Sequence, residues 1–459
     1  MYSVFAKYGL AAHLALVAVA PLFLFPYWGE GTVATVLLWL SVFAFVWSVM
    51  DPETRGLEMP HEARRRVVRR TFRDPLFWTL LTLIFLTGIR ALNNGIALKY
   101  DGEIQKWYMA DAGLDFYPGS VGGAGYLPFA ITVAFTVVVF GCRQSLGRIG
   151  RSAFLLLSSA LAGLASIIVL ILINQGHAGA LKAITLGNTV SSYLGVAMGI
   201  YWLLGTTALV TAFENRWNRV MPFFVLSIGG TAVGMVLFAP TYVSICFAGA
   251  EVLLLGYSFL YAAKTLRGTG NFRFLVVFAI SFALIAAAAY AIIPEKLLLP
   301  HVQPFADGVF FPTAYGELKN ALTGIAFRAW KTNPWFGTGV GSFAIDIRFF
   351  AQAEDWEVLI PLLTSVPSGY WQMLVEYGIV GCVIWALPFG FLFFTYGARL
   401  VRWAKLGVLT EPASWLLPVA FGAVIAVAFF DVSWLRPEVI IGLGALAAVS
   451  ANAFPKERS

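Results

Sequence analysis

Charge is the scarcest property of this sequence. Only 12% of its 459 residues are Asp, Glu, Lys or Arg, whereas a soluble domain has about 25%. A chain with so few charged side chains cannot cover the surface of a soluble fold with polar groups. The composition therefore excludes a cytoplasmic enzyme, a nucleic-acid-binding protein and a disordered chain.

Cysteine and histidine are also scarce. The sequence has 3 cysteines, all in or beside apolar runs, and 4 scattered histidines. Such cysteines act as small apolar residues, and neither residue type shows the spacing of a disulfide framework or a metal site. We therefore predict no metal and no cofactor. The first apolar run is long and lacks a small-residue cleavage site, so it is interpreted as a membrane span rather than a signal peptide.

Long hydrophobic runs, in contrast, fill the sequence. Hydrophobic residues make up 59% of the chain, and the mean hydropathy is +0.79. A helix needs about 20 apolar residues to cross a bilayer core. The sequence predicts an all-α polytopic membrane protein, a single transmembrane domain over residues 1–459. Its spans, about twelve, are expected near 9–28, 32–50, 75–93, 126–142, 153–174, 188–212, 221–239, 241–263, 274–293, 367–397, 413–430 and 437–454.

The positions of the basic residues predict the orientation. About two thirds of the 31 Lys and Arg residues fall in one set of alternating loops, and such residues stay on the cytoplasmic side of a membrane. Both termini are therefore predicted to be cytoplasmic. The net charge of +7 is a topology signal and does not indicate nucleic acid. The run from Arg64 to Arg73 is interpreted as a solvated basic face, with binding of anionic lipid headgroups as the alternative.

Two outward-facing loops are long, a first periplasmic loop at 94–125 and a large periplasmic loop at 294–366. Loops of this length without function are uncommon, so the chemistry is expected on the outer face, the periplasm of a Gram-negative cell. Within the large loop, the amphipathic stretch Tyr315–Trp330 predicts a helix lying on the membrane surface. The glycine-rich turn that follows, at 337–341, is a plausible phosphate cradle.

Three segments resemble the signature of a known family. They are RAWKTNPWFGTGVGSF (328–343), SGYWQMLVEYGIVG (368–381) and LGNTVSSYL (186–194), and they resemble motifs of the O-antigen ligase and O-antigen polymerase superfamily. The resemblance covers about 186–400 and implies a GT-C-like fold in the bacterial inner membrane. It also implies a glycosyltransferase that moves glycan from undecaprenyl diphosphate to a sugar hydroxyl.

The partners implied by the resemblance are an undecaprenyl-diphosphate-linked glycan, a glycan or lipid A core acceptor and the lipid bilayer. Association with other polysaccharide-assembly proteins is left open. No nucleic acid is expected.

This sequence departs from the family pattern at two places. Pro367 and Ser368 stand where ligases carry His-Asn, and Ser244-Ile245 stands where a Ser-Arg pair is usual. Absence of the ligase histidine favours a polymerase of O-antigen or exopolysaccharide repeats over an O-antigen ligase. A transporter or flippase, or a non-catalytic relative that binds lipid-linked glycan, remains an alternative.

Cations are needed to stabilise a diphosphate leaving group. Arg328 is the first candidate because a guanidinium binds phosphate oxygens bidentately and stays charged. Lys331, Arg90 and Lys182 are further candidates, each with an interfacial or capping role as the alternative. Gly339 in the glycine turn is a candidate for close approach to the substrate.

A general base is needed to accept the proton of the acceptor hydroxyl. Glu376 is the best candidate, because an ionisable group within an apolar helix is costly and is by default functional. His301 and the acidic residues Asp346, Glu354, Asp355 and Glu357 are further candidates. Tyr370 and Gln372 match the family motif as substrate contacts. Glu251, inside a predicted span, is interpreted as structural.

Overall fold

The computed structural model describes fifteen stretches of the chain. They are residues 2–24, 30–52, 59–93, 96–101, 106–111, 120–121, 124–174, 192–214, 221–238, 241–265, 313–352, 355, 368–407, 410–428 and 437–450. The helices are α1 (Tyr2–Leu24), α2 (Glu30–Met50), α3 (Pro60–Arg73), α4 (Pro75–Leu92), α5 (Tyr126–Phe140), α6 (Arg148–Asn174), α8 (Ser192–Glu214), α9 (Met221–Phe238), α10 (Thr241–Thr265), α13 (Thr313–Thr332), α14 (Phe343–Phe350), α16 (Gly369–Lys405), α17 (Ala413–Ala428) and α18 (Pro437–Ser450).

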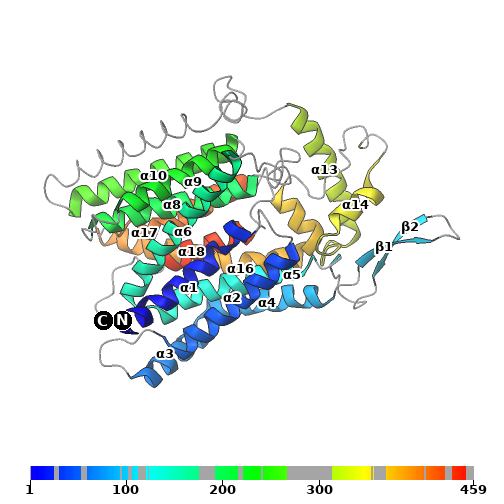
Figure 1. Cartoon of the computed structure of the whole chain (residues 1–459). Coiled ribbons are helices and arrows are strands. Elements are labelled where there is room, and N and C mark those ends of the chain that lie inside the picture. Colours follow the sequence, from blue (N-terminus) through cyan, green and yellow to red (C-terminus); the bar gives the residue numbers. More distant parts are fainter. Residues whose placement is uncertain are drawn as a thin grey trace.

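Most of these helices run side by side in an elongated bundle (Figure 1). Among the described residues, α2, α4, α5, α6, α8, α10 and α16 are the 7 helices long and apolar enough to cross a membrane. Shorter apolar helices are α1, α9, α17 and α18. The chain is thus a helical, multi-pass membrane protein, as its composition predicts.

Helix α8 lies in the interior of the bundle. Within its apolar segment Leu194–Ala212, 94% of the residues are buried, against 33% for α2. A helix that is apolar on all sides suits an interior position, whereas one with an exposed apolar face, such as α2, suits contact with lipid. Of the twelve predicted spans, 274–293 lies outside the described residues, and the count of twelve stays a prediction.

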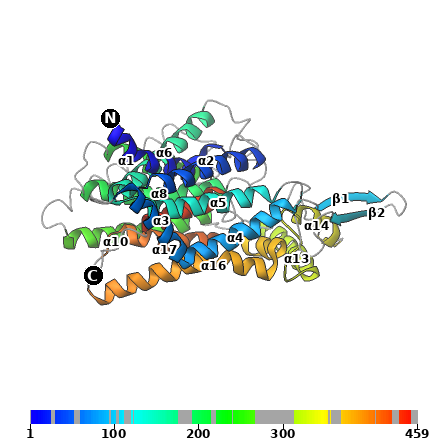
Figure 2. The same ribbon diagram turned by 90° about the horizontal axis from the view of Figure 1, so that it is seen from below.

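An antiparallel hairpin interrupts the helical architecture in the first long loop. Strand β1 (Ile96–Asp101) pairs with β2 (Lys106–Asp111), with Ile96 opposite Asp111 and Asp101 opposite Lys106. The hairpin extends beyond one end of the bundle (Figures 1 and 2). The prediction of an all-α chain did not include it, because strand alternation here is short and lies in a loop rich in Gly and Asp.

A helix, α13, forms over the amphipathic stretch predicted at 315–330, and most of its apolar face packs against other helices. Its contact with a membrane surface stays a prediction. Leu322, Ile325 and Ala329 are buried in a cluster with Phe343 and Ile347 of α14 and with Val375 of α16. An apolar helical face is satisfied equally by protein or by lipid, and here the neighbouring helices cover it.

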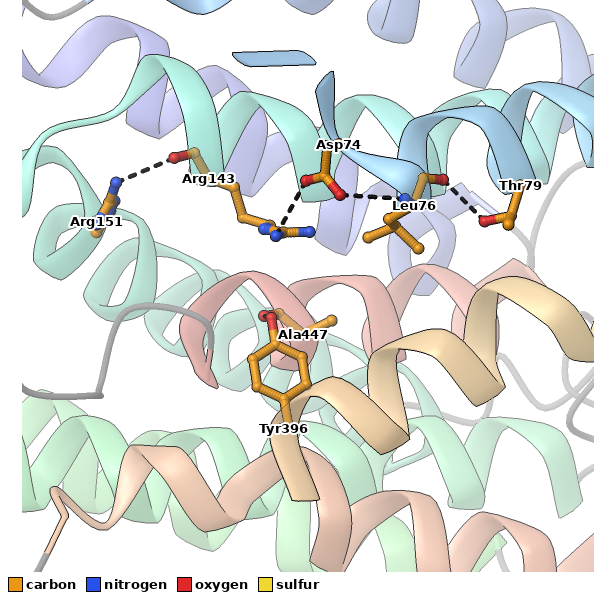
Figure 3. Close-up of polar contacts among 7 residues, drawn as sticks. All are labelled: Asp74, Leu76, Thr79, Arg143, Arg151, Tyr396 and Ala447. Carbon is orange, nitrogen blue, oxygen red and sulfur yellow. Dashed lines mark hydrogen bonds and ion pairs between the residues drawn. The ribbon is translucent and has the colours of Figure 1, made fainter. Parts of the chain in front are cut away.

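Many basic residues gather at the end of the bundle opposite the hairpin, which we call the basic end. It carries α3, the short π-helix η1 (Gly141–Ser145) and the last turn of α16 with Arg402 and Lys405 (Figure 2). Arg143 of η1 forms an ion pair with Asp74 at 3.1 Å (Figure 3). This clustering agrees with the sequence, in which most Lys and Arg residues fall in one set of alternating loops. Which side of the membrane this end faces stays a prediction.

Candidate active site

Helix α16 is broken near its start, at Gly378. This residue has φ +66° and ψ −174°, a backbone conformation that is costly for residues with a Cβ atom. The amides of Ile379 and Val380 donate to the carbonyls of Pro334 and Trp335, at 2.9 and 3.0 Å. The break is therefore satisfied by hydrogen bonds from another segment.

That other segment is the glycine turn. Gly337, Gly339 and Gly341 have φ of 75°, 111° and 76°. The amide of Thr338 donates to the carbonyl of Val375 at 2.7 Å, and that of Gly339 to the carbonyl of Glu376 at 3.3 Å. We call the hydrogen-bonded segments 334–341 and 375–380 the glycine junction.

Glycine at 337 and 378 is required by close approach of the two backbones. A Cβ atom at Gly337 would lie 2.5 Å from the Val375 carbonyl oxygen, and one at Gly378 would lie 2.5 Å from the Gly337 nitrogen. The sequence predicts the turn as a phosphate cradle. In the structure, the amides of Thr338 and Gly339 bind helix α16, so the contact of Gly339 with a substrate stays a prediction.

Arg90 of α4 is buried beside the glycine junction. Its guanidinium donates to the carbonyl of Glu376 and, at 2.7 Å, to that of Phe336. It also lies 4.5 Å from the ring centroid of Tyr377, and only 1% of the residue is exposed. Arg90 thus bridges both halves of the junction. Its role as a diphosphate clamp stays a prediction.

One buried carboxyl group lies within the junction, and a second lies beside it. Glu376 accepts hydrogen bonds from the Gly341 amide, at 3.0 Å, and from Gln372. Asp346 of α14 accepts from Thr338 and Ser342 through Oδ2, at 2.8 and 3.0 Å. Its Oδ1 atom has no hydrogen-bond partner among the described residues. The two carboxyl groups are close enough to interact electrostatically, so the junction brings together two potential proton acceptors.

Burial raises the pKa of Asp346 to about 6, and the hydrogen bonds from Thr338 and Ser342 oppose this rise. Because the folded protein holds this proton more tightly than the unfolded chain, the free energy of unfolding should fall as the pH rises from about 4 to 6. A shift of this size corresponds to about 3 kcal/mol. Asp346→Asn should flatten the curve in this window, measured by thermal unfolding in detergent across pH; an unchanged slope would contradict the assignment.

Arg328 lies on the neighbouring helix α13. Its Nε donates to the carbonyl of Phe350 at 2.8 Å, and its Nη2 pairs with Asp355. The side chain is 31% exposed, so it is more accessible than Arg90. An anion could replace Asp355 as its partner. The structure records no contact between Arg328 and Glu376 or Arg90 among the described residues.

The remaining predicted residues lie apart from the carboxyl pair or outside the described residues. The Nζ atom of exposed Lys331 lies 4.4 Å from the ring centroid of Phe327. The Tyr370 hydroxyl donates to the Ile425 carbonyl of α17 at 3.1 Å. His301 and Lys182 lie outside the described residues, as do Glu354 and Glu357. The structure thus places Gly339, Gln372 and Glu376 beside Arg90 at the glycine junction. The roles predicted for these residues and for Arg328 stay predictions.

Sequence reasoning missed Thr338 and Ser342, which orient Asp346. The spacing of Ser342 and Asp346, four residues apart at the start of α14, is a signal that could have found this pair. Within the described part of the chain, no group of three or more His, Cys, Asp or Glu residues could hold a metal ion.

The sequence matches no protein-family model, and no curated protein is significantly similar to it. The resemblance to the O-antigen ligase and polymerase superfamily thus rests on the three motifs alone.

Proposed function

We propose that this protein is a membrane glycosyltransferase that uses a polyprenyl-diphosphate-linked glycan, acts at the periplasmic face of the bacterial inner membrane and polymerises O-antigen or exopolysaccharide repeats. The observation that carries the proposal is the pair of buried carboxyl groups, Asp346 and Glu376, held at a broken membrane helix. Ionisable groups are kept in apolar surroundings mainly for function. Both family-like motifs, at 328–343 and 368–381, contribute to this one junction.

In the proposed reaction, a carboxylate of the pair accepts the proton of the acceptor hydroxyl. The hydroxyl oxygen forms a bond to the anomeric carbon of the donor glycan, and the bond between that carbon and the diphosphate oxygen breaks. The diphosphate leaves with the electron pair, and Arg328 stabilises its charge. Glu376 is the proposed base, with Asp346 as the second carboxyl group that adjusts its protonation.

Purified protein and lipid-linked repeat units, without metal or nucleotide, provide the test. Elongated glycan on the lipid supports the proposal. Glu376→Gln should slow elongation by roughly 100-fold or more, and Arg328→Gln by a similar factor. Glu251→Gln is the matched control, because Glu251 is also buried, at 3% exposure against 7% for Glu376, but lies in α10, where it accepts a hydrogen bond from Thr206. Equal rates for wild type and Glu376→Gln would remove Glu376 as the base.

One observation favours a second candidate, a transporter of lipid-linked glycan. Interrupted membrane helices are typical of secondary transporters, and α16 is interrupted at Gly378. Proteoliposomes separate the two functions: a transporter moves the labelled lipid-linked glycan between leaflets without forming a new glycosidic bond. An enzyme forms the bond even in detergent, where no leaflets exist.

A further inference from the structure

Helix α3 presents a row of arginines at the basic end of the bundle. It has 14 residues, PHEARRRVVRRTFR, and buries only Ala63 and Val67. Arg65, Arg69 and Arg73 follow one another at intervals of four and so share one face. All three are exposed, and none forms an ion pair with a described residue. We call these three residues the arginine row.

An apolar flank runs beside the arginine row. Val68 is 42% exposed and Phe72 is 55% exposed, and both lie next to the row on the helix surface. Phe72 contacts Trp78, with ring centroids 6.1 Å apart, and Trp78 is itself 51% exposed. Trp78 lies in the first turn of α4, where a membrane-spanning helix begins. Tryptophan favours the membrane–water interface, so this flank marks the depth of the bilayer surface.

The orientation of α3 relative to the spans is fixed by polar contacts. Asp74 joins α3 to α4, accepts from the Leu76 amide at 3.1 Å and pairs with Arg143 of η1 (Figure 3). The indole of Trp78 donates to the Phe72 carbonyl at 3.1 Å, and Nε of Arg64 donates to the Met50 carbonyl at 2.6 Å. The arginine row therefore cannot turn independently of the bundle.

We propose that α3 is an interfacial helix whose arginine row binds the headgroups of anionic phospholipids. Phe72 and Trp78 enter the apolar edge of the bilayer, and the guanidinium groups of Arg65, Arg69 and Arg73 then lie at the level of the lipid phosphates. Guanidinium and phosphate form strong, often bidentate hydrogen bonds. Free anions would satisfy the charges but not the exposed apolar flank, which favours a lipid as the partner.

Native mass spectrometry of the full-length protein in detergent tests this proposal, with phosphatidylglycerol and phosphatidylcholine as the two probes. The wild type should bind phosphatidylglycerol more tightly than phosphatidylcholine. Each surface arginine contributes about a 5-fold gain, so Arg65→Gln/Arg69→Gln/Arg73→Gln should weaken binding on the order of 100-fold. The charge-conserving variant Arg65→Lys/Arg69→Lys/Arg73→Lys should retain most of the affinity.

The matched control removes three other exposed cations, Arg399, Arg402 and Lys405 near the end of α16, by substitution with Gln. This variant should keep its affinity for phosphatidylglycerol within about 2-fold, since the proposal assigns these groups no headgroup. An equal loss of phosphatidylglycerol affinity in both triple variants would overturn the proposal, because the lipid would then respond to the overall surface charge and not to the arginine row. Displacement of the lipid by millimolar inorganic phosphate would also overturn it, because the site would then hold soluble anions. Unchanged thermal unfolding of each variant confirms that it is folded.

Discussion

Replacing Gly378 by alanine should destabilise the protein by about 2–5 kcal/mol, because alanine must adopt a left-handed conformation and its methyl group meets the opposing backbone. The added Cβ atom would lie 2.5 Å from the nitrogen of Gly337, and a backbone atom cannot move aside as the end of a side chain can. The hydrogen bonds of Ile379 and Val380 with the glycine turn would be lost. Thermal unfolding in detergent measures the effect, and glycan elongation should disappear with the junction.

The same helix offers a matched control for this substitution. A Cβ atom at Gly390 of α16 meets no atom within 4 Å, so Gly390→Ala should be neutral or slightly stabilising, by about 0.5–1 kcal/mol. Equal unfolding temperatures for the two alanine variants would contradict the role assigned to Gly378.

Arg90→Met should destabilise the protein by about 3–6 kcal/mol, because it removes two buried hydrogen bonds from a charged group to backbone carbonyls, each contributing about 1.5–3 kcal/mol. The carbonyls are those of Glu376 and Phe336, one on each side of the glycine junction. The ring of Tyr377 also loses its cation. Hydrogen exchange at the amides of Ile379 and Val380 should become faster, since the junction opens when its bridge is removed.

Two further variants separate this bridging role from general loss of charge. Arg90→Lys keeps the charge but not the planar fork that reaches two carbonyls, so an intermediate loss of stability is expected. Arg348→Met removes an exposed arginine of α14 and should change stability by less than about 0.5 kcal/mol. If Arg90→Met and Arg348→Met unfold at the same temperature, the guanidinium does not stabilise the junction.

The candidate site was predictable from the sequence only in part. Glu376 stood out because it is a carboxylate in an apolar run, and Gly337, Gly339 and Gly341 because they follow one another in a turn. Gly378 was noted only as part of a motif, and nothing local shows that it breaks the helix. The left-handed conformation arises because the turn at 334–341 supplies the hydrogen-bond partners that the helix gives up.

Arg90 is a second residue whose hydrogen-bond partners could not be predicted from the sequence. The sequence identified it as an unusual charge at a helix end, but its partner Glu376 is 286 residues away. Arg328 has the same side chain and lies closer in sequence to the junction, yet it pairs with Asp355. The identity of a residue predicts which groups it can bind, and packing decides which of them come within reach.

The sequence by itself determined that this is a multi-pass helical membrane protein, because scarce charge and long apolar runs are local properties that a bilayer selects directly. It also identified the ionisable residues within apolar runs, such as Glu376, whose burial in a membrane helix costs free energy. Only the tertiary structure decided that the glycine turn binds the broken start of α16, that Arg90 bridges the two, and that one apolar face of α13 packs against α14 and α16. These contacts join segments far apart in sequence, and their energy depends on helix packing that no local pattern encodes.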